Sequence, residues 1–423
     1  MSFWFGSKLK LMKKEFYHGW IVLAILFVIG VVISGMHYSF GVFLKFLQED
    51  FGWGRASTSG VYSAYVVLSA VFAIFAGWAL DRYSARAVFT TMGLFTALSL
   101  LLTSQVGSPW QLYLTYSLLL AIGNGGRYVV SMATANRWFT RRRGLVLGVV
   151  GSGFNVSMMV MGPFSAYLIS GYGWRSSFLI IGLITFFIII PCSQLLRRSP
   201  SEIANLPQGN GLEATDYESP LGQSCSRTEG LSLSQAMGTR NLWLLSLTMF
   251  LFSSCVYAVI IHLVPHATDL GIPTIQAASL LTFIGGGGIA GRLLLGRVSD
   301  NIGRKRAYMI CPLLMAGAML WLIESSDLWM LYLFAIVFGF AFGGFSSTGA
   351  AIFGDTFGLR HLGVIMGFAE IGWQLGAAIG SISAGYIFDI SDSYVFAFIA
   401  GIITSLITAI LILFLREPKS STP

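Results

Sequence analysis

The sequence predicts an all-α integral membrane protein in which twelve transmembrane helices form two pseudo-symmetric six-helix bundles. Hydrophobic residues make up 55% of the 423 residues and charged residues only 10%, a balance that does not suit a protein surrounded by water. Apolar stretches long enough to cross a bilayer recur twelve times along the chain. Landmarks of the first six stretches return in the same order in the last six.

Each apolar stretch has about 20 residues or more, which is the length of a helix that spans the hydrocarbon core. The first is too long for the apolar region of a signal peptide, so we expect it to remain as a span. The stretches lie approximately at 18–47, 57–81, 86–105, 109–137, 143–170, 174–196, 239–268, 275–300, 306–324, 327–355, 361–388 and 393–415.

The basic residues lie almost entirely on one side of this arrangement. The loops on the other side carry only the cations Lys45, Arg55 and Arg175, beside acidic residues such as Asp269 and Asp389. By the positive-inside rule both termini are cytoplasmic, and we expect a multi-pass protein of the plasma membrane, the inner membrane in a bacterium. The net charge of +8 is therefore a topological signal, so the lipid bilayer is an expected partner and nucleic acid is not.

An internal duplication defines the two bundles. A shift of 219 positions places Asp81 on Asp300 and Tyr38 on Tyr257, together with matching glycine and arginine positions. Two parallel six-helix repeats follow from this match. The stretch between them is rich in Pro, Ser, Gly and acidic residues, as in a linker, with a short helix expected after Leu231. The expected segments are a cytoplasmic start at 1–17, a bundle at 18–196, a cytoplasmic linker at 197–238, a second bundle at 239–415 and a cytoplasmic tail at 416–423.

Arg292 is a permanent cation near the centre of an apolar helix, in the run TFIGGGGIAGRLLLGRVSD. A central Arg costs about 2.5–3.5 kcal/mol on insertion scales, so it normally faces a water-filled cavity or a partner. An anion is the natural partner. The alternatives are a paired interhelical carboxylate or snorkelling over about 12 Å to the helix end. The preceding glycines, 285–288, indicate either a bend or a tight packing seam.

A second polar group lies on the fourth stretch. Asn124, Arg127, Tyr128 and Ser131 are spaced so that they share one face of a helix. This face either lines a cavity or forms a polar seam between helices, although a seam does not explain the arginine. Two intramembrane arginines, one in each half, could hold a carboxylate through bidentate hydrogen bonds, which favours a small organic anion as substrate.

Five further residues complete the candidate site. Glu370 is either a structural counter-ion of one of the two arginines or the carrier of a coupled proton. Tyr38 and Tyr257 occupy equivalent places in the two halves and are candidates to bind substrate, unless they only pack helices together. His262 is a candidate for substrate binding and, with His37, for proton transfer; the alternative is a hydrogen-bonded helix contact.

The loop GWALDRYSAR (77–86), repeated as GRVSDNIGRKR (296–306), resembles the signature of the major facilitator superfamily. The resemblance implies the fold of that superfamily. It also implies a gating role for Asp81, Arg82, Asp300 and Arg304, which would brace neighbouring helices on the cytoplasmic side. The alternative is that the cations of these loops only set the topology.

A narrower resemblance follows from FYHGWIV (16–22), GNGGRYVVSMATANRWFTRRRGLVLGVVGSG (123–153), HLVPHATDLGI (262–272) and Arg292. Together they resemble the monocarboxylate transporter family and the related bacterial oxalate/formate antiporters over essentially the whole chain. The resemblance implies that Arg292 binds the substrate carboxylate. The Asp found one turn earlier in animal members is Gly288 here, and their essential lysine aligns with Tyr38, so their proton-transfer scheme does not carry over intact.

Residues and resemblance together predict a secondary active transporter of small monocarboxylates of the lactate, pyruvate or acetate type. We expect coupling to protons, alternating access of the two halves, function as a monomer, and neither cofactor nor metal. The alternatives are a carboxylate exchanger of the oxalate/formate type and an anion sensor that does not transport. An enzyme is not expected, because the sequence holds no nucleotide-binding glycine loop, metal-ligand cluster or nucleophile elbow.

Overall fold

The computed structural model describes residues 19–139, 143–196, 231–358 and 362–415, and at residues 81, 136, 137, 143–145, 300, 362 and 363 it describes the backbone alone. Within these residues ten helices are long and apolar enough to cross a membrane. Nine of these helices provide one span each, and the helix over Arg143–Leu195 provides two. The remaining span, the fourth of twelve, is built from four short pieces. The expected segments 1–17 and 416–423 and most of the linker lie outside the described residues.

The first half begins with a helix over residues 19–33, which continues after one turn residue as α2 (Gly35–Phe51). It goes on with α3 (Arg55–Arg82), α4 (Ala85–Thr103), α5 (Pro109–Leu112), η1 (Tyr113–Leu119), α6 (Leu120–Asn124), α7 (Arg127–Trp138) and α8 (Arg143–Leu195). The second half contains α10 (Leu233–Met237), α11 (Arg240–Asp269), α12 (Thr274–Ile302), α13 (Arg304–Ile323), α14 (Leu328–Phe357), α15 (Leu362–Ser391) and α16 (Val395–Leu413). The predicted twelve-span fold is confirmed, and α10 is the expected short helix, with a capping box between Ser232 and Gln235.

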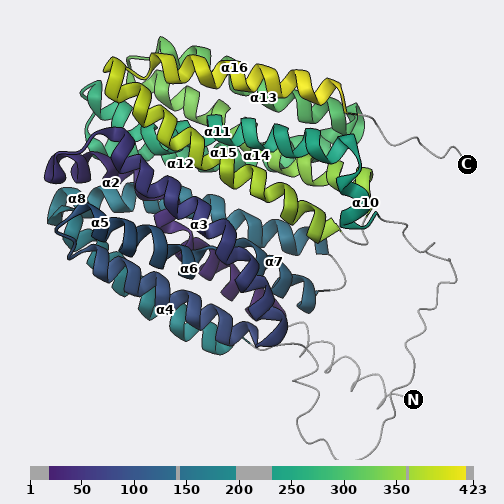
Figure 1. Cartoon of the computed structure of the whole chain (residues 1–423), viewed down its shortest axis with the longest axis horizontal. Helices are drawn as coiled ribbons and strands as arrows, with labels where there is room; N and C mark the ends of the chain where they lie inside the picture. The colour runs from purple at the N-terminus through teal and green to yellow at the C-terminus, as the bar shows by residue number, and fades with distance from the viewer. Residues whose placement is uncertain (1–18, 140–142, 197–230, 359–361, 416–423) are drawn as a thin grey trace, which may run out of the picture.

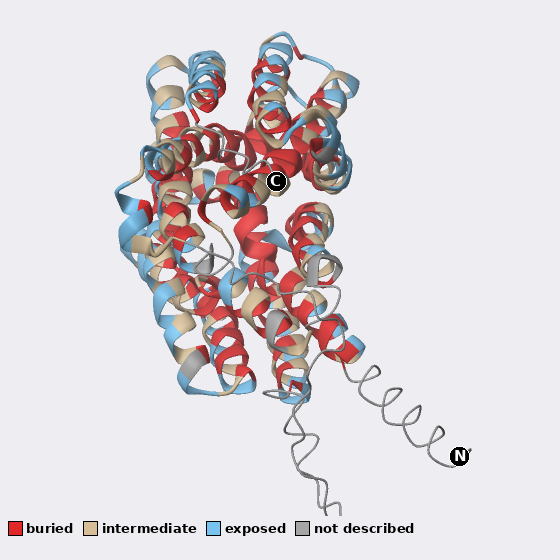
Figure 2. Ribbon diagram, turned by 90° about the vertical axis from the view of Figure 1, so that its right-hand side faces the viewer, coloured by how far each residue is buried: buried red, intermediate tan, exposed pale blue. Residues whose placement is uncertain are grey.

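The two halves lie side by side in Figure 1, with residues 19–196 in purple to blue and residues 231–415 in green to yellow. They meet along three helix pairs, α2 with α11, α3 with α15 and α8 with α12. We call the end at which α11 and α15 finish the acidic end, after Asp269 and Asp389 there, and the opposite end the basic end. Buried residues gather where helices face one another (Figure 2), while large apolar side chains such as Ile74 and Phe187 are exposed, as lipid contact allows.

Glycines explain two irregular features, the turn inside α8 and the interruption of the fourth span. Gly173 has a φ of 76° inside α8, a left-handed conformation that glycine adopts without steric cost, and this is where the chain turns between two spans. In the fourth span, Gly125 and Gly126 separate α6 from α7, and a Cβ on Gly126 would lie 2.2 Å from Ala76 Cβ of α3. The close approach of α3 therefore requires glycine at this position, and Arg127 is the first residue of α7 after the break.

The glycine run of α12, which extends from Thr274 to Ile302, is a packing seam. A Cβ on Gly287 would lie 2.4 Å from the carbonyl oxygen of Ile336 on α14, and a Cβ on Gly285 would lie 2.4 Å from Met159 Cγ on α8. Small residues let helix backbones approach closely in membranes. Of the two alternatives that the sequence left open, close packing on both sides is the one observed.

Candidate functional site

Arg292 reaches from α12 of the second half toward α8 of the first. A Cβ on Gly151 of α8 would lie 2.6 Å from Arg292 Nη1, so the guanidinium lies directly against the bare backbone of the opposite half. Its Nε is buried and has no hydrogen-bond partner. No ion pair involving Arg292 occurs among the described residues. The charge is therefore placed between the halves with donor capacity left over.

Arg127 begins α7 and is half-buried. Its Nη1 donates to the carbonyl oxygen of Asn124 at 3.3 Å. A cation at the first residue of a helix faces the positive end of the helix dipole, which is unfavourable. Tyr38, Tyr257 and Glu370 all lie within electrostatic range of Arg127. The arginine thus belongs to a group of polar side chains that comes from both halves.

Glu370 of α15 makes one weak contact, in which Gln374 Nε2 donates to its Oε1 at 3.4 Å. Arg127 is within electrostatic range, yet the carboxylate forms no ion pair within 4.0 Å in the part of the chain that the structure describes. A tight pair with Arg127 or Arg292, one of the two alternatives for Glu370, is thus not formed among the described residues in this conformation. Both cations remain available to another anion.

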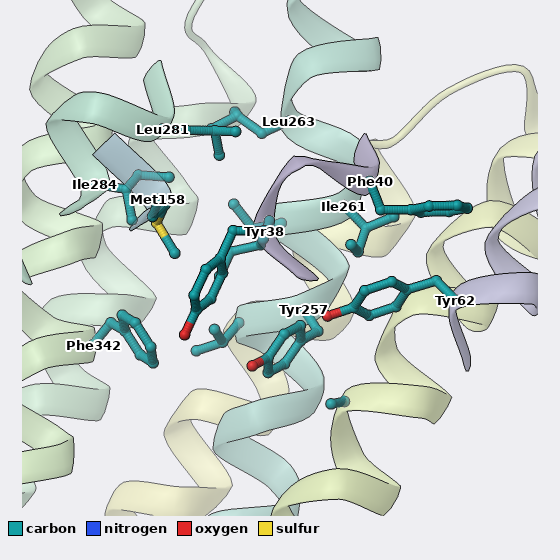
Figure 3. Packing of buried hydrophobic residues seen from close by; sticks show 14 of the residues in the cluster. Tyr38, Phe40, Tyr62, Met158, Tyr257, Ile261, Leu263, Leu281, Ile284 and Phe342 are labelled. Atoms are coloured by element: carbon teal, nitrogen blue, oxygen red, sulfur yellow. The ribbon is translucent and has the colours of Figure 1, made fainter. Parts of the chain in front are cut away.

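His37 and Tyr62 of the first half are connected to Tyr257 of the second half by hydrogen bonds. The His37 Nε2 and the Tyr257 hydroxyl are 3.0 Å apart, and the His37 Nδ1 is 3.2 Å from the Tyr62 hydroxyl. In Figure 3 the hydroxyl groups of Tyr38 and Tyr257 point the same way, and the apolar Leu281 lies on the other side of Tyr38, toward the acidic end. Tyr62 was not a sequence candidate, because nothing in the pattern of α3 distinguishes it from a packing residue.

The predicted polar stripe of the fourth span divides in the structure. Asn124 and Ser131 are fully buried, and their side chains have no hydrogen-bond partner. Tyr128 is instead 49% exposed, although Arg292 and Glu370 lie within electrostatic range of it. Of the four residues, Arg127 and Tyr128 lie with the charged group.

His262 lies elsewhere, in what we call the acidic-end cluster, formed by Arg55, His262, Asp269, Asp389 and Tyr394. His262 Nδ1 is 3.0 Å from the Tyr394 hydroxyl, and its Nε2 is 2.9 Å from the carbonyl oxygen of Ser381. Both ring nitrogens of His262 thus have partners within or beside the acidic-end cluster, and neither contacts Arg127, Arg292 or Glu370. Its roles in substrate binding and proton transfer stay predictions that this placement does not favour.

Arg55 is the centre of the acidic-end cluster. Its Nη2 donates to Asp269 Oδ2 at 2.6 Å, its Nη1 donates to the Tyr394 hydroxyl, and its Cζ lies 3.5 Å above the ring of Phe388. The backbone N–H groups of Arg55 and Ala56 donate to the two oxygens of Asp389 at 2.7 and 2.8 Å. A carboxylate of the second half therefore caps a helix of the first half. The cluster joins the halves at the acidic end.

The gating candidates lie toward the basic end. Arg304 Nη1 donates to Asp355 Oδ1 at 2.8 Å and to the carbonyl oxygen of Ala351 at 3.1 Å, so it braces α13 against α14. Arg82 is exposed, with its Cζ 5.9 Å from the centre of the Trp78 ring. The side chains of Asp81 and Asp300 lie outside the described residues. The gating role stays a prediction for all four.

Comparison with known proteins places this geometry in a family. The model of the Major Facilitator Superfamily matches residues 26–300 and 266–423. The nucleoside transporter NupG superposes with a TM-score of 0.73 at 14% identity, covering 93% of this chain and 98% of that one. A bacterial homologue of the human lysosomal transporter Spinster, in an inward-facing and occupied conformation, superposes with a TM-score of 0.71 at 14% identity, covering 94% and 96%.

The relatives of similar sequence carry a common name. Monocarboxylate transporter 3 of Rattus norvegicus is 26% identical over 381 residues, covering 89% of this chain and 75% of that protein. Monocarboxylate transporter 4 of Gallus gallus is 27% identical over 396 residues, covering 91% and 80%. Twelve spans in two matched halves, the family model along nearly the whole chain and these relatives agree: the chain belongs to the major facilitator superfamily of membrane transporters, among the relatives of the monocarboxylate transporters.

Proposed function

We propose that the protein is a proton-coupled secondary active transporter of small monocarboxylates of the lactate, pyruvate or acetate type. The observation that carries the proposal is the position of Arg292, whose guanidinium lies against Gly151 of the opposite half with its Nε unpartnered. A carboxylate bound there would contact both halves, which is where a substrate has to bind if their relative movement is to carry it across a membrane. The names of the relatives support the same class of substrate.

The charges near the site favour a single carboxylate. Arg127, Arg292 and Glu370 lie within electrostatic range of Tyr38, and in this group the two cations outnumber the carboxylate by one. A monocarboxylate that binds while Glu370 takes up one proton leaves the net charge of this group unchanged, whereas a dicarboxylate would add one negative charge. Charge balance matters because an uncompensated charge is costly away from bulk water.

Glu370 is the proposed carrier of the coupled proton. It has no ion-pair partner within 4.0 Å among the described residues, so its protonation does not require a salt bridge to break. A carboxyl group near the substrate arginines can hold its proton while the anion is bound and release it when the site is empty. His37, which lies within electrostatic range of Arg127, is the second candidate for this step.

The contacts between the halves support alternating access. The acidic-end cluster and the apolar residues around Leu281 separate Tyr38 from the acidic end. Arg292 follows Leu281 by about three turns of α12, toward the basic end. We infer that the basic end is the open end in this conformation, because a Cβ on Gly148 of α8 would have no atom within 4 Å. With both termini in the cytoplasm, this corresponds to an inward-facing state of a monomer in the plasma membrane, the inner membrane in a bacterium.

Reconstitution of Arg292→Lys tests the binding site. The substitution keeps the charge but removes the planar donor fork, so we expect normal folding and a loss of carboxylate binding of about tenfold or more. Arg297→Lys is the matched control, since Arg297 lies on the same helix and is exposed. Binding of wild-type strength in Arg292→Lys, measured by thermal shift with lactate, pyruvate and acetate, would refute the assignment.

Two assays on Glu370→Gln in one set of vesicles test the coupling. Exchange of internal for external substrate cycles the loaded carrier, whereas accumulation driven by a pH gradient requires the empty, deprotonated carrier to return. We expect exchange to persist and gradient-driven accumulation to disappear. Accumulation that persists in the variant contradicts the role of Glu370. A wild-type protein that only exchanges carboxylates is an antiporter of the oxalate/formate type, and one that binds without moving them is a sensor.

A further inference from the structure

Asn155 of α8 has a buried side-chain amide close to the proposed substrate site. Its side chain is 4% exposed, and its Nδ2 has no hydrogen-bond partner. A buried donor without a partner costs about 1–3 kcal/mol, so such a group needs a reason to be there. Neither the spacing of α8 nor its apolar composition indicated this residue from the sequence.

The amide lies one helical turn from Arg292, at the same contact between the halves. Gly151 and Asn155 are successive turns of α8, and Gly288 and Arg292 are successive turns of α12. A Cβ on Gly288 would lie 3.4 Å from Asn155 Oδ1, as a Cβ on Gly151 would lie 2.6 Å from Arg292 Nη1. Each polar side chain thus rests on a glycine of the opposite half, and the two are about 6 Å apart along the helices.

Asn155 lies where the close contact between α8 and α12 ends. Toward the acidic end the two helices pack tightly, with Thr282 donating to the carbonyl oxygen of Met159 at 2.7 Å. Toward the basic end the space opens, since a Cβ on Gly148 would have no atom within 4 Å. A small anion that enters from the basic end therefore meets Arg292 first and the amide of Asn155 one turn deeper.

We propose that Asn155 is a substrate-binding residue that donates from Nδ2 to an oxygen at the 2-position of the carboxylate held by Arg292. The inference rests on the proposed function and adds a basis for selectivity. Two donors about one helical turn apart fit an anion that carries a second acceptor atom next to its carboxylate. The site therefore distinguishes 2-hydroxy and 2-oxo acids from acids without that oxygen, because only the former satisfy the buried amide.

Binding of L-lactate and propanoate to the purified protein tests this directly, because the two acids differ only in the 2-hydroxyl group. We expect wild type to bind L-lactate about tenfold more tightly, the effect of one hydrogen bond to an otherwise unsatisfied buried group. In Asn155→Leu, which has a similar volume but no donor, the ratio of the two dissociation constants falls to about one, through weaker binding of L-lactate alone. Ser157→Ala, which removes another buried and unpartnered polar group of α8, keeps the wild-type ratio.

Two outcomes overturn the inference, and they are separable from failure of the proposed function. Equal affinity of wild type for both acids refutes it without any variant, even if Asn155→Leu does not fold. If Asn155→Leu keeps the wild-type ratio of dissociation constants, the inference is refuted as well. If Arg292→Lys then still weakens the binding of both acids, the transport proposal stands. If neither acid binds to wild type, or if Arg292→Lys changes neither affinity, the proposed function fails together with the inference.

Discussion

Replacing Arg55 by Met should release the acidic end of the transporter. Arg55 is 8% exposed, and its side-chain contacts to Asp269, Tyr394 and Phe388 all cross from the first half to the second. Met keeps much of the apolar stem and removes the charge and the donors. The backbone N–H of residue 55 still donates to Asp389, so the start of α3 keeps its cap.

The size of the effect follows from the contacts that are lost. The charged hydrogen bond to Asp269, at 2.6 Å, contributes about 2 kcal/mol, and the guanidinium over the Phe388 ring about 1 kcal/mol. Tyr394 keeps His262 as a partner at 3.0 Å and adds little. A bias of about 3 kcal/mol against the state closed at this end changes its population ratio by about a hundredfold.

Thiol labelling measures this ratio. Leu281 is fully buried on α12, near the tyrosines and toward the acidic end (Figure 3). In a background without native cysteines, Leu281→Cys reports on opening when a membrane-impermeant maleimide is added from the acidic-end side. We expect Arg55→Met to accelerate labelling by at least tenfold, with a ceiling set by the chemical step.

Arg175→Met is the matched control for Arg55→Met. Arg175 pairs with Asp50 at 2.7 Å and lies 4.2 Å from the ring of Trp174, so it offers the same two kinds of contact at the same end. All of these residues belong to the first half, and the substitution should leave the labelling rate unchanged. Labelling of Arg55→Met within twofold of the parent protein would refute the assignment of the cluster as a contact that closes the acidic end.

Two glycine substitutions test the packing around the site. Gly151→Ala places a Cβ 2.6 Å from Arg292 Nη1, so the affinity for a carboxylate should fall by about tenfold while the protein folds normally. Gly148→Ala, whose Cβ has no atom within 4 Å, should bind as wild type does. Equal affinities of the two variants in a thermal-shift titration would contradict the position of the guanidinium. Gly343→Ala places a Cβ 1.9 Å from a backbone oxygen of α12 and should lower the melting temperature by about 10 °C or prevent folding. Gly317→Ala, which meets no atom within 4 Å on α13, should melt like wild type or slightly above it, and similar melting of both variants would contradict the seam.

The number and order of the spans could be predicted because both depend on local properties of the chain. Bilayer thickness fixes the length of each apolar stretch, and the repeated landmarks fix the two halves. The ends of the spans were less accurate. The first span ends at Phe51 and the second begins at Arg55, so the loop between them is shorter than the predicted stretches 18–47 and 57–81 imply. Gly52 makes this short turn possible with a φ of 66°, and Asp389 caps the second helix from more than 300 residues away in the sequence.

The contacts between the halves could not be predicted, because they join residues that are far apart in the sequence. Arg55 and Asp269 each stood out as loop charges on the same side, but nothing in the sequence paired them or added Tyr394. The same limit applies to His262, which as a lone membrane histidine suggested proton transfer and lies in the acidic-end cluster. Asn155 carried no signal, since one Asn in an apolar helix is also consistent with a helix contact.

The partners of the arginines separate a structural role from a functional one. Arg55 has every contact that a buried cation requires, including a carboxylate, a hydroxyl and an aromatic face. Arg292 has an unpartnered Nε, and Arg127 begins a helix, where its charge opposes the dipole; neither has a carboxylate within 4.0 Å among the described residues. A protein stabilises such cations only if water or an anion completes them. The two arginines that lack a carboxylate partner lie beside tyrosines from both halves, and this is the arrangement that the proposed transport of an anion between the two halves requires.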